Sequence, residues 1–502
     1  MNKLMKLCCA LLALLMLVTV FAACDDKKGD GLAATTTTTT TTTPPPTETG
    51  PQIQSPLGII PGSVDFGGQT YKLLLWTNAK YRTWPEALTE GEHINNDLYL
   101  RDQMMEDELG VVFDVTYRDS SSSHDALYNE ALEGKTVYEA ICTYSLDPPK
   151  LALEGVLTDL YTLEYPDTDM PWYPSDSSNW EVRKRLFFVA NNSAVQNILT
   201  NWVVYANRTM IENKGLENIE QVVIDGNWTV DTLKTYSRNW ASEAESNASK
   251  VEADRVYGFS IGHRTAMEAF YHGSGFTVYS KDEKGDPVAD FLSKTAISQT
   301  SSMVDKLMDL MNSPEFTAGP SNGMTNYNAP LQLRNSAFHL SCLDQYSLIG
   351  EDGTYVVIPI PKLNDQQQRY YATTNSCLDM WCVPTSASNP ELGGMVIEAS
   401  AYNDYDEIAP KFWDMDFKYR YSTSDNGVKI FDLIRSSFVV DFGRFWLQLG
   451  TPYEQLNRCI CTNAEALVLQ NNYATTILGI KTSTNANLKN LKKMMDAMDA
   501  ES

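Results

Sequence analysis

Histidine is scarce in this chain of 502 residues, which contains only five. They stand at positions 93, 124, 263, 272 and 339, and no pair has the H-E-x-x-H or H-x-x-x-H spacing. This absence disfavours a zinc hydrolase. Carboxylates, in contrast, are too numerous for spacing to single out a catalytic pair, so a glycosidase stays open as an alternative.

Positive charge is also in short supply, because 39 Lys and Arg oppose 64 Asp and Glu, for a formal net charge of −25. Lys3 and Lys6 are the only charged residues among the first 23, so the rest carries 37 basic and 64 acidic residues, a net −27. This balance disfavours a nucleic acid and an anionic membrane surface as partners.

The nine cysteines contain no C-x-x-C motif. Cys377 and Cys382 are five positions apart, which places them on opposite faces of a strand. Cys459 and Cys461 have no histidine near them. We therefore expect small buried side chains and no metal site or cofactor. A disulfide among the six cysteines after Cys24 stays open, because pairing cannot be read from sequence.

The N-terminus has the pattern of a secretory signal. Lys3 and Lys6 precede 15 apolar or small residues, 7–21, which are too few to cross a bilayer comfortably. The run ends in VFAAC and changes abruptly to DDKK, which resembles a bacterial lipobox with Phe21 in place of the usual Leu. The resemblance implies a signal peptide, 1–23, and a lipid on Cys24 that anchors the chain to the extracellular face of the cell membrane. A plain secretory signal is the alternative.

Residues 24–62 are predicted to be a disordered linker. Nine threonines, 35–43, are followed by three prolines, 44–46, and such a composition cannot form a packed core. The linker would let a folded part stand away from the membrane.

Alternating strands and helices follow from residue 63. The expected strands are 71–76, 111–117, 138–144, 186–190, 201–205, 335–341, 356–360 and 376–383. The expected helices are 96–109, 124–133, 148–160, 229–241, 264–272, 295–312, 327–335 and one that begins at Asn389 and Pro390, and residues 403–502 look largely helical. This alternation predicts an α/β fold with parallel sheets.

The segment YVVIPIPKL, a second strand and the N-P-E helix start resemble the crossover of extracellular solute-binding proteins. The segments VYEAICTYSLDPPKLALEGVLTDL, WVVYANRTMIENKGLE and GNWTVDTL resemble the maltose-binding type in the same order, and MPWYPSDSSNW suggests its clostridial-type branch. The resemblance implies a two-lobed, type II periplasmic-binding-protein-like fold. Its expected lobes are 63–190 with 355–412, and 191–354 with 413–502.

The resemblance further implies a non-catalytic, monomeric binding lipoprotein of an ABC importer, which captures a solute, most simply a carbohydrate, for permease subunits in the membrane. Two other functions stay open: a cell-surface glycosidase or esterase, and a sensor or adhesion module. Residues 258–262, GFSIG, formally fit the nucleophile elbow of esterases. We expect a structural turn there, with no histidine within reach of Ser260.

The predicted ligand-binding residues are Trp76, Asn78, Tyr144, Trp172, Trp202, His272, Asp379 and Trp381. Three of these end or follow first-lobe strands, where parallel sheets bind ligands. Trp172 lies in an irregular segment, Trp202 begins a second-lobe strand, and His272 precedes a Gly-Ser-Gly turn. Asp379 and Trp381 share a strand face, which pairs a hydroxyl acceptor with a stacking surface. Core packing is the alternative for each tryptophan.

Overall fold

The computed structural model describes residues 65–119, 127–130, 133, 138–240, 254–262, 266, 268–313, 315–318, 328–446 and 473–500. They belong to one compact unit, Gln54–Ser502. The predicted signal peptide, Cys24, the linker up to residue 62, Cys459 and Cys461 lie outside the described residues.

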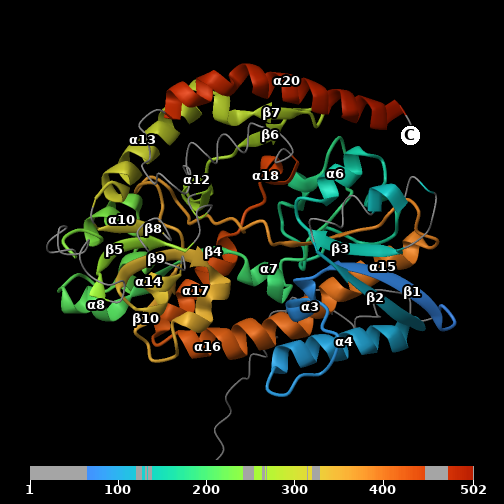
Figure 1. Ribbon diagram of the computed structural model, residues 1–502, viewed down its shortest axis with the longest axis horizontal. Helices are drawn as coiled ribbons and strands as arrows, with labels where there is room; N and C mark the ends of the chain where they lie inside the picture. Colours follow the sequence, from blue (N-terminus) through green and yellow to red (C-terminus); the bar gives the residue numbers. More distant parts are fainter. Residues whose placement is uncertain are drawn as a thin grey trace, which may run out of the picture. The chain divides into compact units, whose positions relative to one another are not determined.

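A four-stranded sheet forms the first lobe (Figure 1). Its order is β11-β3-β1-β2, with β1 (Gln69–Trp76), β2 (Val111–Arg118), β3 (Ala140–Tyr144) and β11 (Asp379–Cys382). β1 pairs in parallel with β2 and β3, which confirms the predicted parallel sheet, and β11 is antiparallel to β3. Leu73 and Leu74 point to opposite faces and are both fully buried, so both faces of the sheet are covered.

A five-stranded sheet forms the second lobe, in the order β10-β4-β9-β5-β8. Its strands are β4 (Trp202–Asn207), β5 (Tyr257–Ile261), β8 (Phe316–Ala318), β9 (Ser336–Cys342) and β10 (Tyr355–Ile358). The prediction grouped β10 with the first lobe. That assignment is wrong, because β10 pairs antiparallel with β4. The rest of the predicted residue ranges of the two lobes stay predictions.

Helices surround both sheets. Those near the first sheet are α3 (Ala79–Arg82), α4 (His93–Leu109), α6 (Pro148–Leu153) and α15 (Pro390–Asn403), with 3₁₀ turns η1 (Leu160–Thr162) and η2 (Ser177–Trp180). The others are α7 (Val195–Leu199), α8 (Arg208–Asn213), α9 (Ile219–Ile224), α10 (Val230–Tyr236), α12 (Glu268–Gly273), α13 (Lys294–Met311), α14 (Ala329–Gln332), α16 (Lys418–Tyr421), α17 (Asp425–Ser437), α18 (Phe442–Trp446) and α20 (Tyr473–Ala500). Two further 3₁₀ turns, η5 (Asp290–Leu292) and η7 (Leu343–Leu348), and a hairpin of β6 (Tyr279–Lys281) and β7 (Pro287–Ala289) complete the described elements.

Several predicted elements are shorter in the structure or absent from it, among them α14, at 329–332 for an expected 327–335, and β11, at 379–382 for an expected 376–383. The helix expected over 148–160 ends at Leu153, because Gly155 turns the chain with φ +74°. The helix expected over 229–241 ends at Tyr236. Residues 186–190 are buried but form no strand, since Val189 makes only one bridge, to Trp381.

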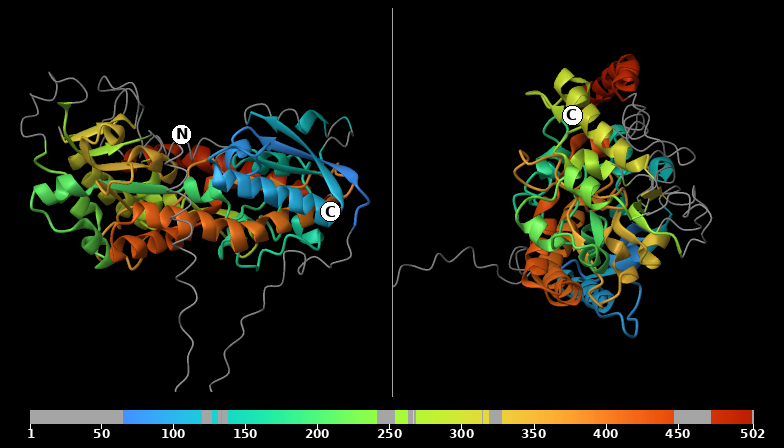
Figure 2. Two further views of the ribbon diagram at one scale, coloured as in Figure 1. Left: turned by 90° about the horizontal axis from the view of Figure 1, so that it is seen from below. Right: turned by 90° about the vertical axis from the view of Figure 1, so that its left-hand side faces the viewer.

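The chain passes between the lobes several times. Residues 190–201 lead from the first sheet to β4, and residues 359–378 lead from β10 back to β11. A π-helical stretch, η8 (Asp404–Ile408) and η9 (Pro410–Phe417), joins α15 to α16 and extends from one sheet towards the other (Figure 2). The segment after α17 then turns back through residue 438, which bridges to residue 372.

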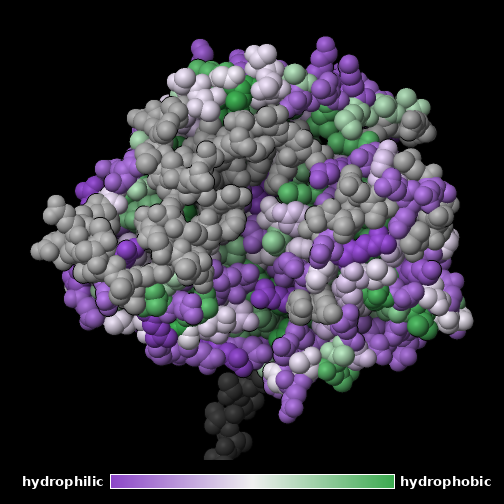
Figure 3. All heavy atoms as spheres, viewed as in Figure 1, coloured by the Kyte–Doolittle hydropathy of each residue, from purple (hydrophilic) through white to green (hydrophobic). Residues whose placement is uncertain are grey.

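The described surface is mainly hydrophilic on the face shown in Figure 3, where apolar residues form small separate patches. Among the described helices, none combines the length and apolar character that crossing a bilayer requires.

Candidate functional site

Three predicted site residues meet at the edge of the first sheet. Asp379 stands opposite Tyr144 in the antiparallel pair of β11 and β3. Its carboxylate accepts hydrogen bonds from the Trp76 indole N–H and the Thr83 hydroxyl, and the Trp76 and Tyr144 rings lie 5.6 Å apart. Trp76 and Asp379 are buried, whereas Tyr144 is half-buried and Asn78 is exposed. Only the last two therefore present surface to a ligand here.

The other first-lobe tryptophans lie in the core. Trp381 packs edge-on against Trp84, with ring centroids 5.8 Å apart. Trp172 packs edge-on against Tyr402 of α15 at 5.3 Å. Both are buried, as the core-packing alternative expects. Their part in ligand binding stays a prediction.

Trp202 and His272 lie beside a buried ion pair. Arg444 binds both carboxylate oxygens of Glu268 at 2.9 Å, and the Trp202 indole donates to Glu268 Oε1 at 3.3 Å. Burial, and secondarily the charge of Arg444, lowers the pKa of His272 to about 3, so this histidine is neutral at physiological pH. Both residues are buried, and their part in ligand binding stays a prediction.

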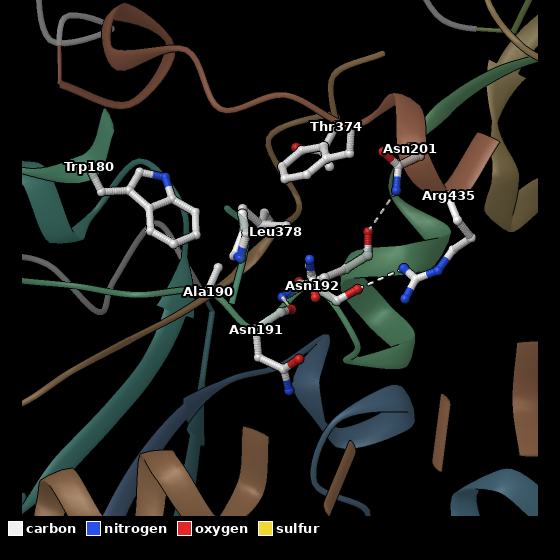
Figure 4. A pocket seen from close by; sticks show the side chains of 11 residues that line it. Trp180, Ala190, Asn191, Asn192, Asn201, Thr374, Leu378 and Arg435 are labelled. Atoms are coloured by element: carbon white, nitrogen blue, oxygen red, sulfur yellow. Dashed lines mark hydrogen bonds between the residues drawn. The ribbon is translucent and has the colours of Figure 1, made fainter. Parts of the chain in front are cut away.

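A small cavity of about 30 Å³, the crossover cavity, lies where the chain passes between the lobes (Figure 4). It is lined by Pro174, Trp180, Ala190, Asn191, Asn192, Asn197, Asn201, Thr374, Leu378, Arg435 and Phe438. Segments from residues 190–201, 374–378 and 435–438 thus meet around one space. None of the predicted site residues lines it.

Several polar atoms of the crossover cavity are unsatisfied. Trp180 Nε1, Asn201 Oδ1 and Thr374 Oγ1 are buried and have no hydrogen-bond partner among the described residues. Leaving such groups unpaired typically costs about 1–3 kcal/mol each. A water molecule or a ligand atom in the cavity would relieve that cost, and the volume suffices for a group of one or two heavy atoms.

A larger hollow, the outer groove, adjoins the crossover cavity at Asn192, which lines both. The outer groove has a volume of about 600 Å³ and is lined by Tyr161, Thr168, Asp169, Met170, Pro171, Tyr173, Ser175, Ser177, Ser178, Glu181 and Asn192. Tyr161 is 44% exposed, and its hydroxyl donates to Glu181 Oε1 at 2.6 Å. The groove therefore offers an aromatic face, hydroxyls and carboxylates in a volume typical of ligand sites.

The sequence analysis singled out this segment, but the residue that it selected, Trp172, does not line the groove. The irregular stretch MPWYPSDSSNW, 170–180, supplies six of the groove-lining residues, while its Trp172 faces the core. The signal was the lack of a helix or strand period. That signal identifies a loop but not which of its side chains point outward.

The prediction for Ser260 was wrong. Ser260 lies in strand β5, and its Oγ is 2.8 Å from Nδ1 of His339 on β9. The other ring nitrogen, Nε2, lies 3.0 Å from Asn328 Oδ1, so an amide and not a carboxylate stands behind the histidine. Ser260 and His339 are both fully buried in the sheet. A substrate therefore cannot reach Ser260 and His339. Their side-chain contact links the neighbouring strands β5 and β9.

The described cysteines 142, 342, 377 and 382 are all free. In the described part of the chain, no group of three or more His, Cys, Asp or Glu side chains is arranged to hold a metal ion.

Solved structures of other proteins share this two-lobed arrangement. The galacto-N-biose-/lacto-N-biose I-binding protein of the ABC transporter from Bifidobacterium longum matches with a TM-score of 0.56 and 14% identity, over 85% of this chain and 98% of that one. The chain has the fold of a two-lobed solute-binding protein. The GacH receptor of Streptomyces glaucescens matches with a TM-score of 0.54 and 12% identity, over 82% and 98% of the two chains.

A third match, the ABC transporter associated binding protein from B. animalis subsp. lactis in complex with β-1,6-galactobiose, has a TM-score of 0.52 and 12% identity, over 84% of this chain and 98% of that one. No protein-family model matches the sequence, and no curated protein sequence matches it. At these identities the likeness establishes the fold, and the ligand must be inferred from this chain's own residues.

Proposed function

We propose that this protein is the substrate-binding component of an ABC importer and captures a carbohydrate between its two lobes. The observation that carries the proposal is the crossover cavity, where three segments that connect the lobes line one space next to a ligand-sized groove. A solute that occupies both hollows would touch these connecting segments. Its binding would therefore bias how the lobes are arranged.

The outer groove has the side chains that a sugar requires. A sugar presents apolar ring faces and a belt of hydroxyl groups. The exposed ring of Tyr161 can stack on such a face, and Asp169 and Glu181 can accept hydrogen bonds from hydroxyls. Binding of this kind needs no cofactor and no catalytic group.

A thermal-shift screen against oligosaccharides tests the function and also locates the site. A ligand that binds only the folded chain must raise the unfolding temperature. Tyr161→Ala should reduce affinity at least tenfold if the ligand lies in the outer groove, and Tyr144→Ala should do so if it lies at the sheet edge predicted from sequence. Tyr419→Ala, at a tyrosine that is 73% exposed, is the matched control. If no carbohydrate raises the unfolding temperature, the proposed ligand class is wrong.

The proposal extends to location and partners. The lipobox-like VFAAC motif supports a lipid anchor at Cys24, and the fold supports recognition by membrane permease subunits. We further propose a monomer of the clostridial-type branch. Cys24→Ala should release the protein from the membrane into the medium with its fold unchanged, as measured by fractionation and circular dichroism. A Cys24→Ala protein that stayed with the membrane would disprove the anchor.

A further inference from the structure

The crossover cavity has a charge character opposite to that of the chain as a whole. The chain has 64 acidic and 39 basic residues. The described residues that line the cavity nevertheless include one cation, Arg435, and no Asp or Glu. Figure 4 shows the Arg435 guanidinium beside Asn192, on the side of the cavity away from Trp180. Among the described lining residues, the half-buried Arg435 is thus the one charged side chain.

Arg435 is only partly satisfied by its neighbours. Its Nη1 donates to the Asn192 carbonyl at 2.8 Å, and its guanidinium lies 5.6 Å from the Trp413 ring. The nearest acidic influence is Asp414, whose Oδ1 accepts from Lys418 at 3.0 Å. Within the described residues no carboxylate pairs with Arg435, and burial lowers its pKa to about 10. Most of its five N–H donors therefore lack an anionic acceptor.

Of the three unsatisfied atoms in the described cavity lining, two can donate a hydrogen bond. The Trp180 indole N–H and the Thr374 hydroxyl are fully buried and have no partner among the described residues. Together with the guanidinium fork, they give the cavity three donor groups, against one unpaired acceptor among the described lining residues, Asn201 Oδ1. A carboxylate is the complementary group, because it only accepts hydrogen bonds and can bind a guanidinium with both oxygens. The cavity of about 30 Å³ has room for the two carboxylate oxygens.

We propose that the crossover cavity receives the carboxylate of an acidic carbohydrate, such as a uronate, with Arg435 as the residue that selects for the charge. This inference rests on the proposed function and deepens it. The sugar ring lies in the outer groove, which adjoins the cavity at Asn192. Asp169 and Glu181 of the groove accept from ring hydroxyls and disfavour a second negative charge at that end. The preferred ligand therefore has one acidic group, at its inner end.

Matched ligand pairs test the inference on the full chain. Binding of glucuronate and glucose, and of galacturonate and galactose, is measured by calorimetry for the unmodified protein and three variants. Arg435→Gln removes the charge, and Arg435→Lys keeps it without the guanidinium fork. Arg420→Gln is the control, because Arg420 is 55% exposed and its nearest acid, Glu351, lies 3.9 Å away.

The expected result is at least tenfold tighter binding of the acidic member of a pair. Arg435→Gln should abolish this preference while affinity for the neutral member stays within twofold, Arg435→Lys should keep part of it, and Arg420→Gln should keep all of it. Equal binding of acidic and neutral sugars by the unmodified protein would overturn the inference, as would a preference that survives in Arg435→Gln.

Acetate separates failure of this inference from failure of the proposed function. If no sugar binds but acetate raises the unfolding temperature of the unmodified protein and not of Arg435→Gln, the anion site stands and the carbohydrate assignment fails. If sugars bind and neither acetate nor the acid group changes the affinity, the proposed function stands and the anion site fails. If neither acetate nor any sugar changes the unfolding temperature, both the anion site and the proposed function are wrong.

Discussion

At the scale of single residues, Asp379 couples protonation to folding. Burial raises the pKa of Asp379 from 3.8 to about 7, although the hydrogen bonds from Thr83 and Trp76 oppose this. The folded state therefore holds the proton more tightly than the unfolded state. The stability contributed by this group is complete below about pH 4 and is lost as the pH rises towards 7. One pKa unit corresponds to about 1.4 kcal/mol, so the loss is on the order of a few kcal/mol.

Asp379→Asn should flatten this dependence. The free energy of unfolding from urea denaturation, compared at pH 5 and pH 8, should fall less in the variant than in the unmodified protein. Some slope should remain, because burial also raises the pKa of Asp102 to about 8. Asp352→Asn is the control, since the pKa of Asp352 is lowered to about 2 and this group stays ionised throughout the range. An unchanged slope in Asp379→Asn would disprove the coupling.

Ser260 provides a second test at this scale. Ser260→Ala removes the hydroxyl next to Nδ1 of the buried His339, so one polar atom loses its partner inside the sheet. We expect the free energy of unfolding to fall by about 1–3 kcal/mol, with ligand affinity unchanged. Chemical denaturation and calorimetry measure the two effects. If the unmodified protein hydrolysed a chromogenic ester and Ser260→Ala did not, the structural role would be refuted and the esterase alternative restored.

At the scale of elements, capping residues could be read directly from sequence. Thr229 and Asn389 accept hydrogen bonds from the backbone N–H groups of Thr232 and Leu392, which agrees with the helix starts predicted at residues 229 and 389. The signal is strong because a cap depends on three or four neighbouring residues only.

Replacing the cap of α15 tests its contribution. Asn389→Ala should lower the free energy of unfolding by about 1 kcal/mol, because the Leu392 N–H, which lies 3.3 Å from Asn389 Oδ1, loses its acceptor. Asn389→Asp should change the free energy of unfolding little, since the aspartate carboxylate can accept the same hydrogen bond from the Leu392 N–H. Urea denaturation measures both variants. Equal losses in both would show that the cap hydrogen bond is not the cause.

Other elements could not be predicted, because distant residues decide them. Residues 186–190 have the composition of a strand, but only Val189 finds a partner, in Trp381. The surroundings of the tryptophans are also decided by residues that are distant in sequence. Trp76 at a strand end looked like a ligand platform, yet its N–H is bound to Asp379, 303 positions away. Local patterns show that a residue is apolar or aromatic and do not show what it faces.

At the scale of the whole molecule, α20 links the two lobes. It contacts α13 in the second half of the chain and α6 next to the first sheet, and Figure 1 shows it along one side of both. Its last turns are tied to the turn at 182–185, where Arg183 binds Asp496 at 2.7 Å, Asp499 at 2.5 Å and Asp286 at 2.8 Å.

Arg183→Gln should loosen this link. Because one guanidinium joins three carboxylates, its loss should speed hydrogen exchange of the last turns of α20 more than a typical surface pair would. Arg238→Gln removes an ordinary exposed pair with Asp309 and is the control. Hydrogen exchange followed by mass spectrometry compares the two. Equal exchange of residues 490–500 in both variants would contradict the role of Arg183.

The alternation of strands and helices was enough to predict an α/β fold and the parallel pairing in the first sheet, and the resemblance to solute-binding proteins added the two lobes. It was not enough to assign β10, because β10 and β11 are separated by only 20 residues but join different sheets. The site was harder still. The crossover cavity is built from residues between 174 and 438, and no local pattern signals that Trp180, Thr374 and Arg435 meet.

Isothermal titration calorimetry with neutral and acidic oligosaccharides tests most directly whether this chain binds a carbohydrate without transforming it. A binding protein with one site predicts heats that return to baseline after each injection and saturate at one ligand per chain. A baseline that stays displaced while substrate lasts would show turnover and identify a hydrolase, and the absence of any saturable heat across the panel would contradict carbohydrate binding.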